Sequence, residues 1–466
     1  MKSMIPFWCL SVAVLGPLIL AAQNVSGPGG KLAYVRGGDI WVKTLPDGES
    51  REISQGGAAA DPQWSSSGEW LSYSQKGKLV VVPANGDREK ALTFEPTVYV
   101  RSATMTWSPS QEEFAFIDQE GLWVVRLGEN GPLRRLVLSH SVVGKITGFQ
   151  WSPGGDRFAV SVTARLPGLP EGRVGRLWRV NADGSQAQQI FSAREPEEMA
   201  GGDLSVAGWS SDGQRILIWL FHEFSPSLVA DGAPLGTVPA NGGPARTLTQ
   251  DVLVHPDSLA ISPRKPEVVA VSGWSRESWT SKRLMLADID SGLSTPLTDA
   301  KATEASRPPI HGYASSGPLI GAKSAVASPA WSPDGTWIAY VSGPDIGNVG
   351  GGEQAKKGLA QRRIWIMTAD GTQARQLTSD PQYRDEYPLW SHDGRYVLFI
   401  RMDEQGETSI WSLDLNNGAL RKLVDDIVGP ERPAAGVAAI SIQGRDNWFG
   451  YYGHIGWSRL MAWHQE

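Results

Sequence analysis

The sequence predicts an all-β fold, a single β-propeller built from four-stranded antiparallel blades. Short β-prone segments alternate with tight Asp-Gly and Asn-Gly turns, which is the pattern of successive hairpins. No long stretch shows the 3.6-residue periodicity of an amphipathic helix. A tryptophan recurs near the start of most repeats, at Trp64, Trp107, Trp151, Trp209, Trp331 and Trp390.

The clearest copy of the repeat lies between Pro329 and Thr378. Pro333, Asp334 and Gly335 suit a tight turn, because glycine adopts a positive φ at little cost. A glycine-rich insertion follows, and a second turn is expected at an Asp-Gly pair further on. The stretch therefore predicts four strands in a row, at Ala330–Ser332, Trp337–Val341, Ile364–Met367 and Arg375–Thr378.

Weaker copies of this unit predict eight blades in all, with seven as the alternative count. The sixth copy is degenerate, because its start at Leu259–Lys265 contains no tryptophan. The first copy, from Lys31, lacks an inner strand, which we expect the segment Asn447–Ser458 to supply. The predicted blades lie at 31–54, 61–94, 104–138, 148–191, 206–249, 257–298, 329–378 and 387–424, with a closing segment at 437–466.

Burial explains why such units are expected to form a ring. A single four-stranded sheet cannot cover its two apolar faces or its edges, whereas sheets packed face to face around an axis bury both faces. The 466 residues include 53 glycines, 31 prolines and 20 tryptophans, which suits many turns and aromatic packing between sheets. The net charge of -6 provides no broad basic surface, so nucleic-acid binding is not expected.

Residues 1–22 predict a secretory signal peptide. Lys2 precedes an apolar run from Ile5 to Leu20, and a small-residue cleavage point follows near Ala22. The run is short for a membrane-spanning helix, although a membrane anchor is the alternative. The only cysteine, Cys9, lies inside this leader, so no disulfide is expected in the mature chain. We expect an exported protein, periplasmic or extracellular, that remains tethered to the membrane if the leader is retained.

The repeats resemble those of a known propeller family. The motifs WSPDGTWIAYVS, IWIMTADGTQARQLT and WSHDGRYVLFI, within Trp331–Thr378 and Trp390–Val424, are similar to the PD40, or TolB-like, version of the WD40-like repeat. The resemblance is fair from Asp61 to Phe191 and weak from Asp251 to Thr298. It implies a fold shared by TolB, by the propeller domains of prolyl-oligopeptidase-type enzymes and by many exported proteins.

Two features of these relatives are not matched. TolB carries an α/β domain before its ring, whereas here the first propeller strands begin by Lys31. Peptidase relatives carry a hydrolase domain with a GxSxG nucleophile elbow, and this sequence contains no GxSxG. The nearest approximation, at Gly312–Gly317, has one residue too many. The resemblance therefore implies the ring without the catalytic domain.

The candidate site residues are those that break the repeat. Tryptophans at fixed repeat positions are interpreted as packing between blades, and Asp-Gly and Asn-Gly pairs as turns. A charged run before an inner strand has a bland interpretation as a solvated entry loop. No metal motif, cofactor or catalytic residue is recognised. The binding candidates are Trp274, Trp279, His222, His255, His311, Arg384, Asp385 and Glu386.

Long insertions are predicted on one face of the ring. The 1–2 and 3–4 turns of a four-stranded blade lie on one face, and the 2–3 and 4–1 connections lie on the other. Long loops on a rigid scaffold commonly carry function, and we expect Ser342 to Arg363 to contact a partner. All the long insertions belong to the second class, at 164–175, 195–205, 221–234, 273–281, 299–328 and 342–363.

The sequence favours an exported, non-catalytic propeller that binds a protein or a cell-envelope component, and we expect a monomer. One alternative is a hydrolase or lyase with a site in the axial funnel. Convergence of three or more of Asp385, Glu386, His255 and His311 would favour it. The other alternative is a regulatory propeller paired with a separately encoded peptidase.

Overall fold

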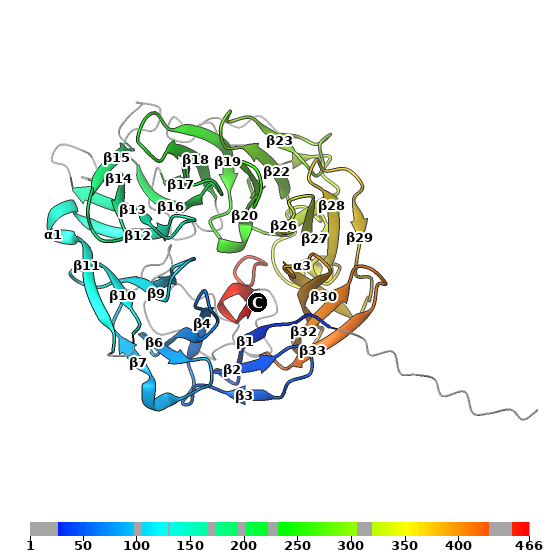
Figure 1. Ribbon diagram of the computed structural model, residues 1–466. Helices are drawn as coiled ribbons and strands as arrows, with labels where there is room; N and C mark the ends of the chain where they lie inside the picture. The colour runs from blue at the N-terminus through cyan, green and yellow to red at the C-terminus, as the bar shows by residue number, and fades with distance from the viewer. Residues whose placement is uncertain are drawn as a thin grey trace, which may run out of the picture.

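The computed structural model shows β-sheets arranged around a central axis (Figure 1). It describes residues 27–96, 105–128, 131–165, 173–193, 202–221, 232–304, 319–427 and 450–465. Six sheets have four strands, and a seventh with eight strands contains two blades, which gives eight blades among these residues. The predicted propeller of four-stranded antiparallel blades is confirmed.

The first half of the ring contains blades 1 to 4. Blade 1 consists of β1 (Lys31–Arg36), β2 (Asp39–Thr44), β3 (Ser50–Glu52) and β34 (Met461–His464). Blade 2 consists of β4 (Ala59–Trp64), β5 (Trp70–Gln75), β6 (Lys78–Pro83) and β7 (Leu92–Phe94), with η1 (Arg88–Lys90) before β7. Blade 3 consists of β8 (Met105–Trp107), β9 (Glu113–Ile117), β10 (Gly121–Arg126) and β11 (Leu133–Ser139). The short helix α1 (His140–Val143) leads to blade 4, which consists of β12 (Lys145–Trp151), β13 (Arg157–Arg165), β14 (Arg173–Asn181) and β15 (Gln188–Ser192).

The second half contains blades 5 to 8. Blade 5 consists of β16 (Asp203–Trp209), β17 (Arg215–Phe221), β18 (Ala233–Pro239) and β19 (Arg246–Val252). After η3 (Pro256–Ser258), blade 6 consists of β20 (Leu259–Ile261), β21 (Glu267–Ser272), β22 (Arg283–Asp288) and β23 (Ser294–Pro296). A ribbon of β24 (Thr303–Glu304) and β25 (Leu319–Ile320) precedes blade 7, with β26 (Ser324–Trp331), β27 (Trp337–Pro344), α3 (Glu353–Leu359), β28 (Arg363–Thr368) and β29 (Arg375–Gln376). Blade 8 consists of β30 (Tyr383–Trp390), β31 (Tyr396–Asp403), β32 (Thr408–Asp414) and β33 (Leu420–Asp425).

The hairpin turns follow the expected chemistry. In blade 7, the Asp334 carboxylate accepts hydrogen bonds from the Ser332 hydroxyl at 2.5 Å and the Thr336 amide at 3.0 Å. Gly335 has a φ of +71°, which a residue with a Cβ rarely adopts. The Ser332 hydrogen bond lowers the pKa of Asp334 because it favours the ionised form. This carboxylate therefore closes a turn.

The tryptophans in the first strands connect neighbouring blades. Trp331 donates its indole hydrogen to the Ala260 carbonyl of the preceding blade at 2.9 Å, and Trp390 donates to Ala330 at 3.0 Å. The corresponding bonds run from Trp64 to Ala462, from Trp107 to the Ser72 hydroxyl, from Trp151 to Thr106 and from Trp209 to Gln150. The hydrophobic core is accordingly a series of apolar clusters between adjacent blades. This agrees with the inter-blade role expected for these residues.

Blade 6 differs from the others, as its degenerate sequence predicts. Its inner strand β20 has only three residues and carries no tryptophan. Its second strand β21 pairs at one position, Val252 with Ser272, with the outer strand of blade 5, so that the two blades form one eight-stranded sheet.

The strand that completes blade 1 is β34, at the very end of the chain, where it pairs antiparallel with β1 over Lys31–Tyr34. The expectation that Asn447–Ser458 supplies this strand is wrong. Residues 447–449 lie outside the described part, and residues 450–458 form a β-bridge followed by the start of a 3-10 turn, η4 (Trp457–Arg459). The paired residues Met461–His464 lie immediately after that turn.

Candidate functional site at the axis

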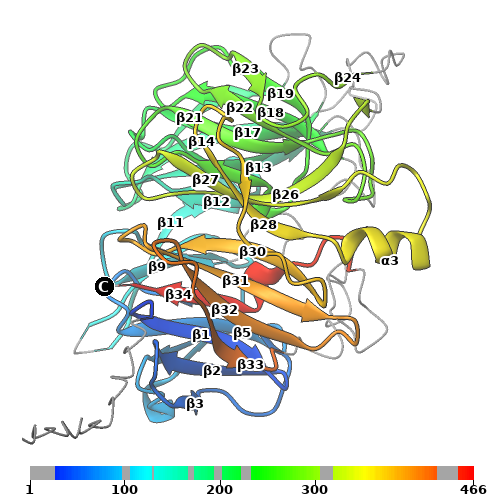
Figure 2. The same ribbon diagram turned by 90° about the vertical axis from the view of Figure 1, so that its right-hand side faces the viewer.

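Residues 450–460, here called the axial segment, lie inside the ring in both views (Figures 1 and 2). The segment contains the isolated bridge Tyr451–His454 and the turn η4. Its contacts reach five blades. It contacts Val35 of blade 1 and Asp61 of blade 2, and the contacts with blades 6, 7 and 8 are described below. The Tyr452 carbonyl accepts a 2.8 Å hydrogen bond from the Ser278 amide in the loop of blade 6. The axial segment therefore holds several blades at once.

A buried ion cluster joins the axial segment to blades 7 and 8. Glu386 Oε1 accepts hydrogen bonds from Arg362 at 2.6 Å and from Arg384 Nε at 2.7 Å. Glu386 Oε2 accepts from the indole Nε1 of Trp457 at 2.6 Å. Both arginines also donate to the Gly453 carbonyl, at 2.9 and 3.1 Å. Both carboxylate oxygens of Glu386 are therefore engaged.

The electrostatics of this cluster follow from its burial. Burial raises the pKa of Glu386, but Arg384 and Arg362 outweigh burial and hold the pKa below its ordinary value. Burial lowers the pKa of Arg384 to about 10, against the opposing effect of Glu386. A glycine is required at 453, where a Cβ would lie 2.5 Å from the Ser278 hydroxyl oxygen. The cluster is therefore closely fitted around the axial segment.

A second polar group contains the predicted residue His255. Its imidazole stacks on that of His454, with ring centroids 3.7 Å apart and an interplanar angle of 15°. His454 Nε2 lies 2.8 Å from Asp257 Oδ1, and the Ser328 hydroxyl donates to Asp257 Oδ2 at 2.8 Å. Burial raises the pKa of Asp257, but His454, His255 and Ser328 outweigh it and hold the pKa at about 2.

Backbone bulges place some of these groups. The register of β4, β26 and β30 shifts within each strand, and a non-glycine residue with positive φ lies at each shift. These residues are Asp61, Ser328 and Tyr387, at φ of 56°, 48° and 57°. Such bulges re-aim side chains next to functional sites. Asp61 pairs with Arg459, and Ser328 holds Asp257.

The charged run at Arg384–Glu386 is not a solvated loop, so that interpretation is wrong. These residues lie in β30 and are 1%, 0% and 4% exposed. Asp385 forms a bidentate pair with Arg401, at 2.8 and 3.2 Å. Successive side chains of a strand point to opposite faces of the sheet. Arg384 and Glu386 accordingly pair with each other, whereas Asp385 pairs with Arg401. The structure thus uses all three in buried ion pairs.

Four further residues are predicted as binding candidates, Trp274, Trp279, His222 and His311. Trp279 is 5% exposed and packs in the cluster around the axis, whereas Trp274 is half-buried. His222 and His311 lie outside the described residues. Within the described residues, Glu386 and His255 belong to different polar groups. The neighbouring residues Gly453 and His454 of the axial segment join these two groups.

Sequence reasoning missed Arg362, Trp457, His454 and Lys282. Lys282 is 0% exposed and donates from Nζ to the carbonyls of Ser275 and Thr280. Burial lowers its pKa to about 7, although Glu277, Asp251 and Asp345 act in the opposite direction. A signal was available for three of them, because Arg362 lies in the insertion 342–363 and both His454 and Trp457 lie in the segment expected to close the ring.

The insertion of blade 7 forms helix α3. Ala355 and Leu359 are 0% exposed and join the cluster at the axis, whereas Glu353, Gln354 and Lys357 are exposed. The antiparallel strand order places all 2–3 and 4–1 connections on one face of the ring. Figure 2 shows α3 and β24 on the same side of the molecule. The described part of the insertion is therefore a docked helix with one exposed side.

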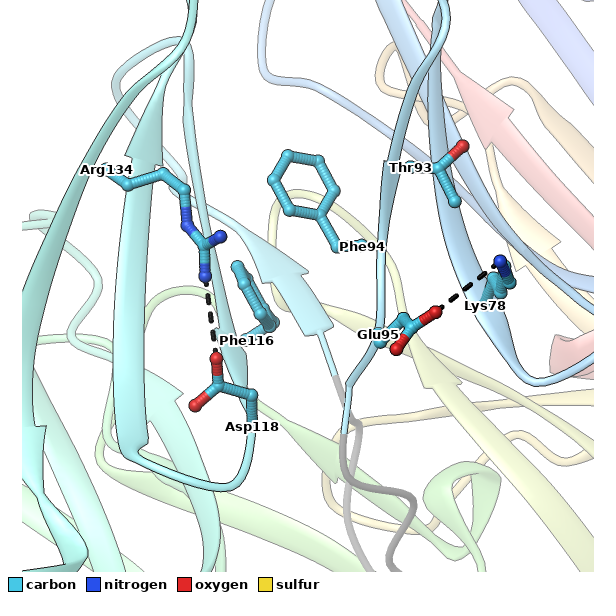
Figure 3. A pocket seen from close by; sticks show the side chains of 7 residues that line it. All are labelled: Lys78, Thr93, Phe94, Glu95, Phe116, Asp118 and Arg134. Carbon is cyan, nitrogen blue, oxygen red and sulfur yellow. Dashed lines mark hydrogen bonds and ion pairs between the residues drawn. The ribbon is translucent and has the colours of Figure 1, made fainter.

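A separate pocket of about 420 Å³ lies between blades 2 and 3 (Figure 3). The Arg134 guanidinium lies 4.7 Å from the Trp123 ring centroid and pairs with Asp118 at 3.5 Å. Lys78 pairs with Glu95 at 3.4 Å. The charges that line the pocket thus oppose one another in pairs. Its lining residues are Lys78, Thr93, Phe94, Glu95, Phe116, Asp118 and Arg134.

Two features are absent from the described residues, a cluster of metal ligands and a membrane-spanning helix. No group of three or more histidine, cysteine, aspartate or glutamate side chains arranged for a metal ion occurs in this part of the chain. Within the same residues, no helix is long and apolar enough to cross a membrane. The predicted signal peptide, residues 1–22, lies outside them.

Several solved structures are similar to the chain. No protein-family profile matches the chain. The TolB structure from Acinetobacter baumannii matches with a TM-score of 0.30 and 13% identity, over 68% of this chain and 69% of that one. The β-propeller domain of the Trilobed protease from Pyrococcus furiosus matches with a TM-score of 0.40 and 10% identity, over 79% and 97%. TolB and the propeller domain of a protease are thus among the solved structures to which the chain is similar.

Peptidases also occur among the matches. The acylaminoacyl peptidase from Pyrococcus horikoshii matches with a TM-score of 0.44 and 11% identity, over 86% of this chain and 52% of that one. The Bacillus subtilis (strain 168) protein named "Uncharacterized peptidase YuxL" is 35% identical over 80 residues. This match covers 17% of the chain and 10% of the relative, and the chain spans about half of the acylaminoacyl peptidase.

Proposed function

We propose that this chain is an exported, non-catalytic propeller that binds a protein or cell-envelope component through the face that carries its 2–3 and 4–1 loops. The observation that carries the proposal is the docked helix α3. It is fixed by Ala355 and Leu359 and presents Glu353, Gln354 and Lys357 to solvent. A rigid helix on a rigid ring is preorganised for binding, because little conformational entropy is lost on association.

The axial ionisable groups support a structural role over a catalytic one. Glu386 is neutralised by two arginines and Asp385 by a third. A general base must face a substrate, whereas Glu386 is 4% exposed and both of its carboxylate oxygens already accept hydrogen bonds. Export is proposed from the leader at residues 1–22.

Site-specific photo-crosslinking in cells tests the binding face. A photoreactive amino acid at Gln354 on α3 is compared with one at Asn416, in a 3–4 turn on the opposite face. We expect a discrete crosslinked product from the cell envelope at Gln354 and none at Asn416. The same products at both positions, or none at Gln354, would contradict the proposal.

A peptidase encoded separately is the second candidate partner, favoured by the 80-residue similarity to YuxL. If it is correct, the protein captured at Gln354 is a peptidase, and its activity on fluorogenic peptides changes several-fold when the purified propeller is added. Hydrolysis of those peptides by the purified propeller alone would instead favour the alternative of an enzyme with its site in the axial funnel.

A further inference from the structure

The stacked imidazole rings of His255 and His454 hold the axial segment. Their buried surroundings disfavour an added positive charge. His255 is 2% and His454 7% exposed. An ionised carboxylate only accepts hydrogen bonds, so Nε2 of His454 carries the proton shared with Asp257. The remaining ring nitrogen, Nδ1, has no hydrogen-bond partner in either histidine among the described residues. The surroundings of His255 therefore favour its neutral form.

Added protons are costly at this position. A protonated His255 ring donates from both nitrogens, and its buried Nδ1 has no acceptor among the described residues. The same proton would place a positive charge against the face of the stacked His454 ring. Burial and the neighbouring His454 lower the pKa of His255 well below its ordinary value, and Asp257 opposes this only in part.

Groups on every surrounding element enter this balance. Asp257 on η3 favours protonation, whereas Lys282 of the blade 6 loop opposes it. Tyr387 on β30 interacts with Asp257, and burial raises its pKa, so that it stays neutral in the acid range. Arg362 and Arg384 donate to Gly453, the residue next to His454, and Glu386 balances them. Asp257 is thus the one carboxylate in this balance that favours protonation of the histidines.

We propose that the axial segment is an acid-sensitive latch, which opens from the ring when His255 of the stacked pair takes up a proton. A histidine that opening exposes to solvent has the ordinary histidine pKa of about 6.5. The open state then binds more protons than the closed state below that pH, so the closed state is present above it and is lost as the pH falls. The four residue pairs between β1 and β34 remain, because these strands lie outside the histidine contacts.

Amide hydrogen exchange of the full chain, read by mass spectrometry, tests the latch. After correction for the intrinsic pH dependence of exchange, we expect the opening of 451–457 to increase between pH 6.5 and 5.0. The increase is up to about tenfold per pH unit for each proton taken up. The inner strand β31 serves as the internal reference and should stay protected. An opening of 451–457 that does not change over this range would overturn the proposal.

Two substitutions assign the effect to the pair. His255→Phe keeps a ring for stacking but cannot be protonated, so the acid-dependent opening should fall at least severalfold. Asp257→Asn removes the compensating charge, so opening should begin at a higher pH. The control His392→Asn lies in an exposed turn and should behave like the unaltered chain. If the histidine variant is unfolded by circular dichroism, the aspartate variant decides, and an unchanged onset contradicts the latch.

Discussion

Trp457 donates its indole hydrogen to Oε2 of Glu386 at 2.6 Å, and this bond joins the end of the chain to the inner strand of the last blade. The same carboxylate receives Arg362 from the blade 7 insertion and Arg384 from its own strand. Three parts of the ring thus depend on one buried anion. The axial segment stabilises the ring there through side chains, in addition to the strand pairing of β34.

The substitution Glu386→Gln should be strongly destabilising. It leaves Arg384, which is 1% exposed, and Arg362, which is 3% exposed, without their anion. Breaking a buried pair by removing one partner typically costs about 3–5 kcal/mol. Urea unfolding measures the loss. The control Glu353→Gln, in the exposed first turn of α3, should change stability by no more than about 0.5 kcal/mol. A loss for Glu386→Gln as small as that of the control would show that the arginines find other partners.

The indole hydrogen bonds between blades predict a position-specific effect. Trp331→Phe keeps most of the aromatic packing but leaves the Ala260 carbonyl without its donor, which should cost about 1–3 kcal/mol. Trp365→Phe changes a half-buried residue of the third strand in the same blade and should cost less. Thermal unfolding of the two variants gives the comparison. Equal losses would mean that packing, and not the hydrogen bond, dominates.

Helix α3 should detach locally when its anchor is shortened. Leu359→Ala removes a side chain that is 0% exposed, and such a change in a core costs about 2–5 kcal/mol. We expect faster amide exchange over 353–361 and weaker crosslinking from Gln354, whereas Lys357→Ala on the exposed side should leave both unchanged. If Leu359→Ala lowers global stability without faster exchange in α3, the helix is part of the cooperative ring.

The fold could be predicted because its signals are local. The turn at Ser332–Thr336 is encoded within five residues, and each first-strand tryptophan marks a blade. The site could not be predicted to the same depth, because its pairings are remote in sequence. Arg384–Glu386 showed as a charged run, but nothing local indicated that Trp457 would cover it. The latch histidines come from η3 and from the end of the chain, so only the closed ring brings them together.

The closing strand shows a different limit. The segment at Asn447–Ser458 is richer in aromatic residues than Met461–His464, yet the latter pairs with β1. Trp457 is used instead inside the ring, where it is 1% exposed. Hydrophobic content alone does not distinguish a segment that fills the axis from one that completes a sheet, because both contribute apolar side chains to the cluster around the axis.

Lys282 predicts an alkaline dependence of stability. Burial lowers its pKa from 10.5 to about 7, so between these values the unfolded chain binds more protons than the folded one. Stability should therefore rise with pH from about 7, by at most about 1.4 kcal/mol per pH unit for one proton. The comparison with Lys282→Met isolates this dependence, because tyrosines and other groups titrate equally in both proteins. Urea unfolding at pH 7.5 and 9.5 should show a gain in the unaltered chain that Lys282→Met lacks, while Lys357→Met on the exposed side of α3 retains it. Parallel pH profiles for Lys282→Met and the unaltered chain would show that Lys282 stays charged in the folded ring.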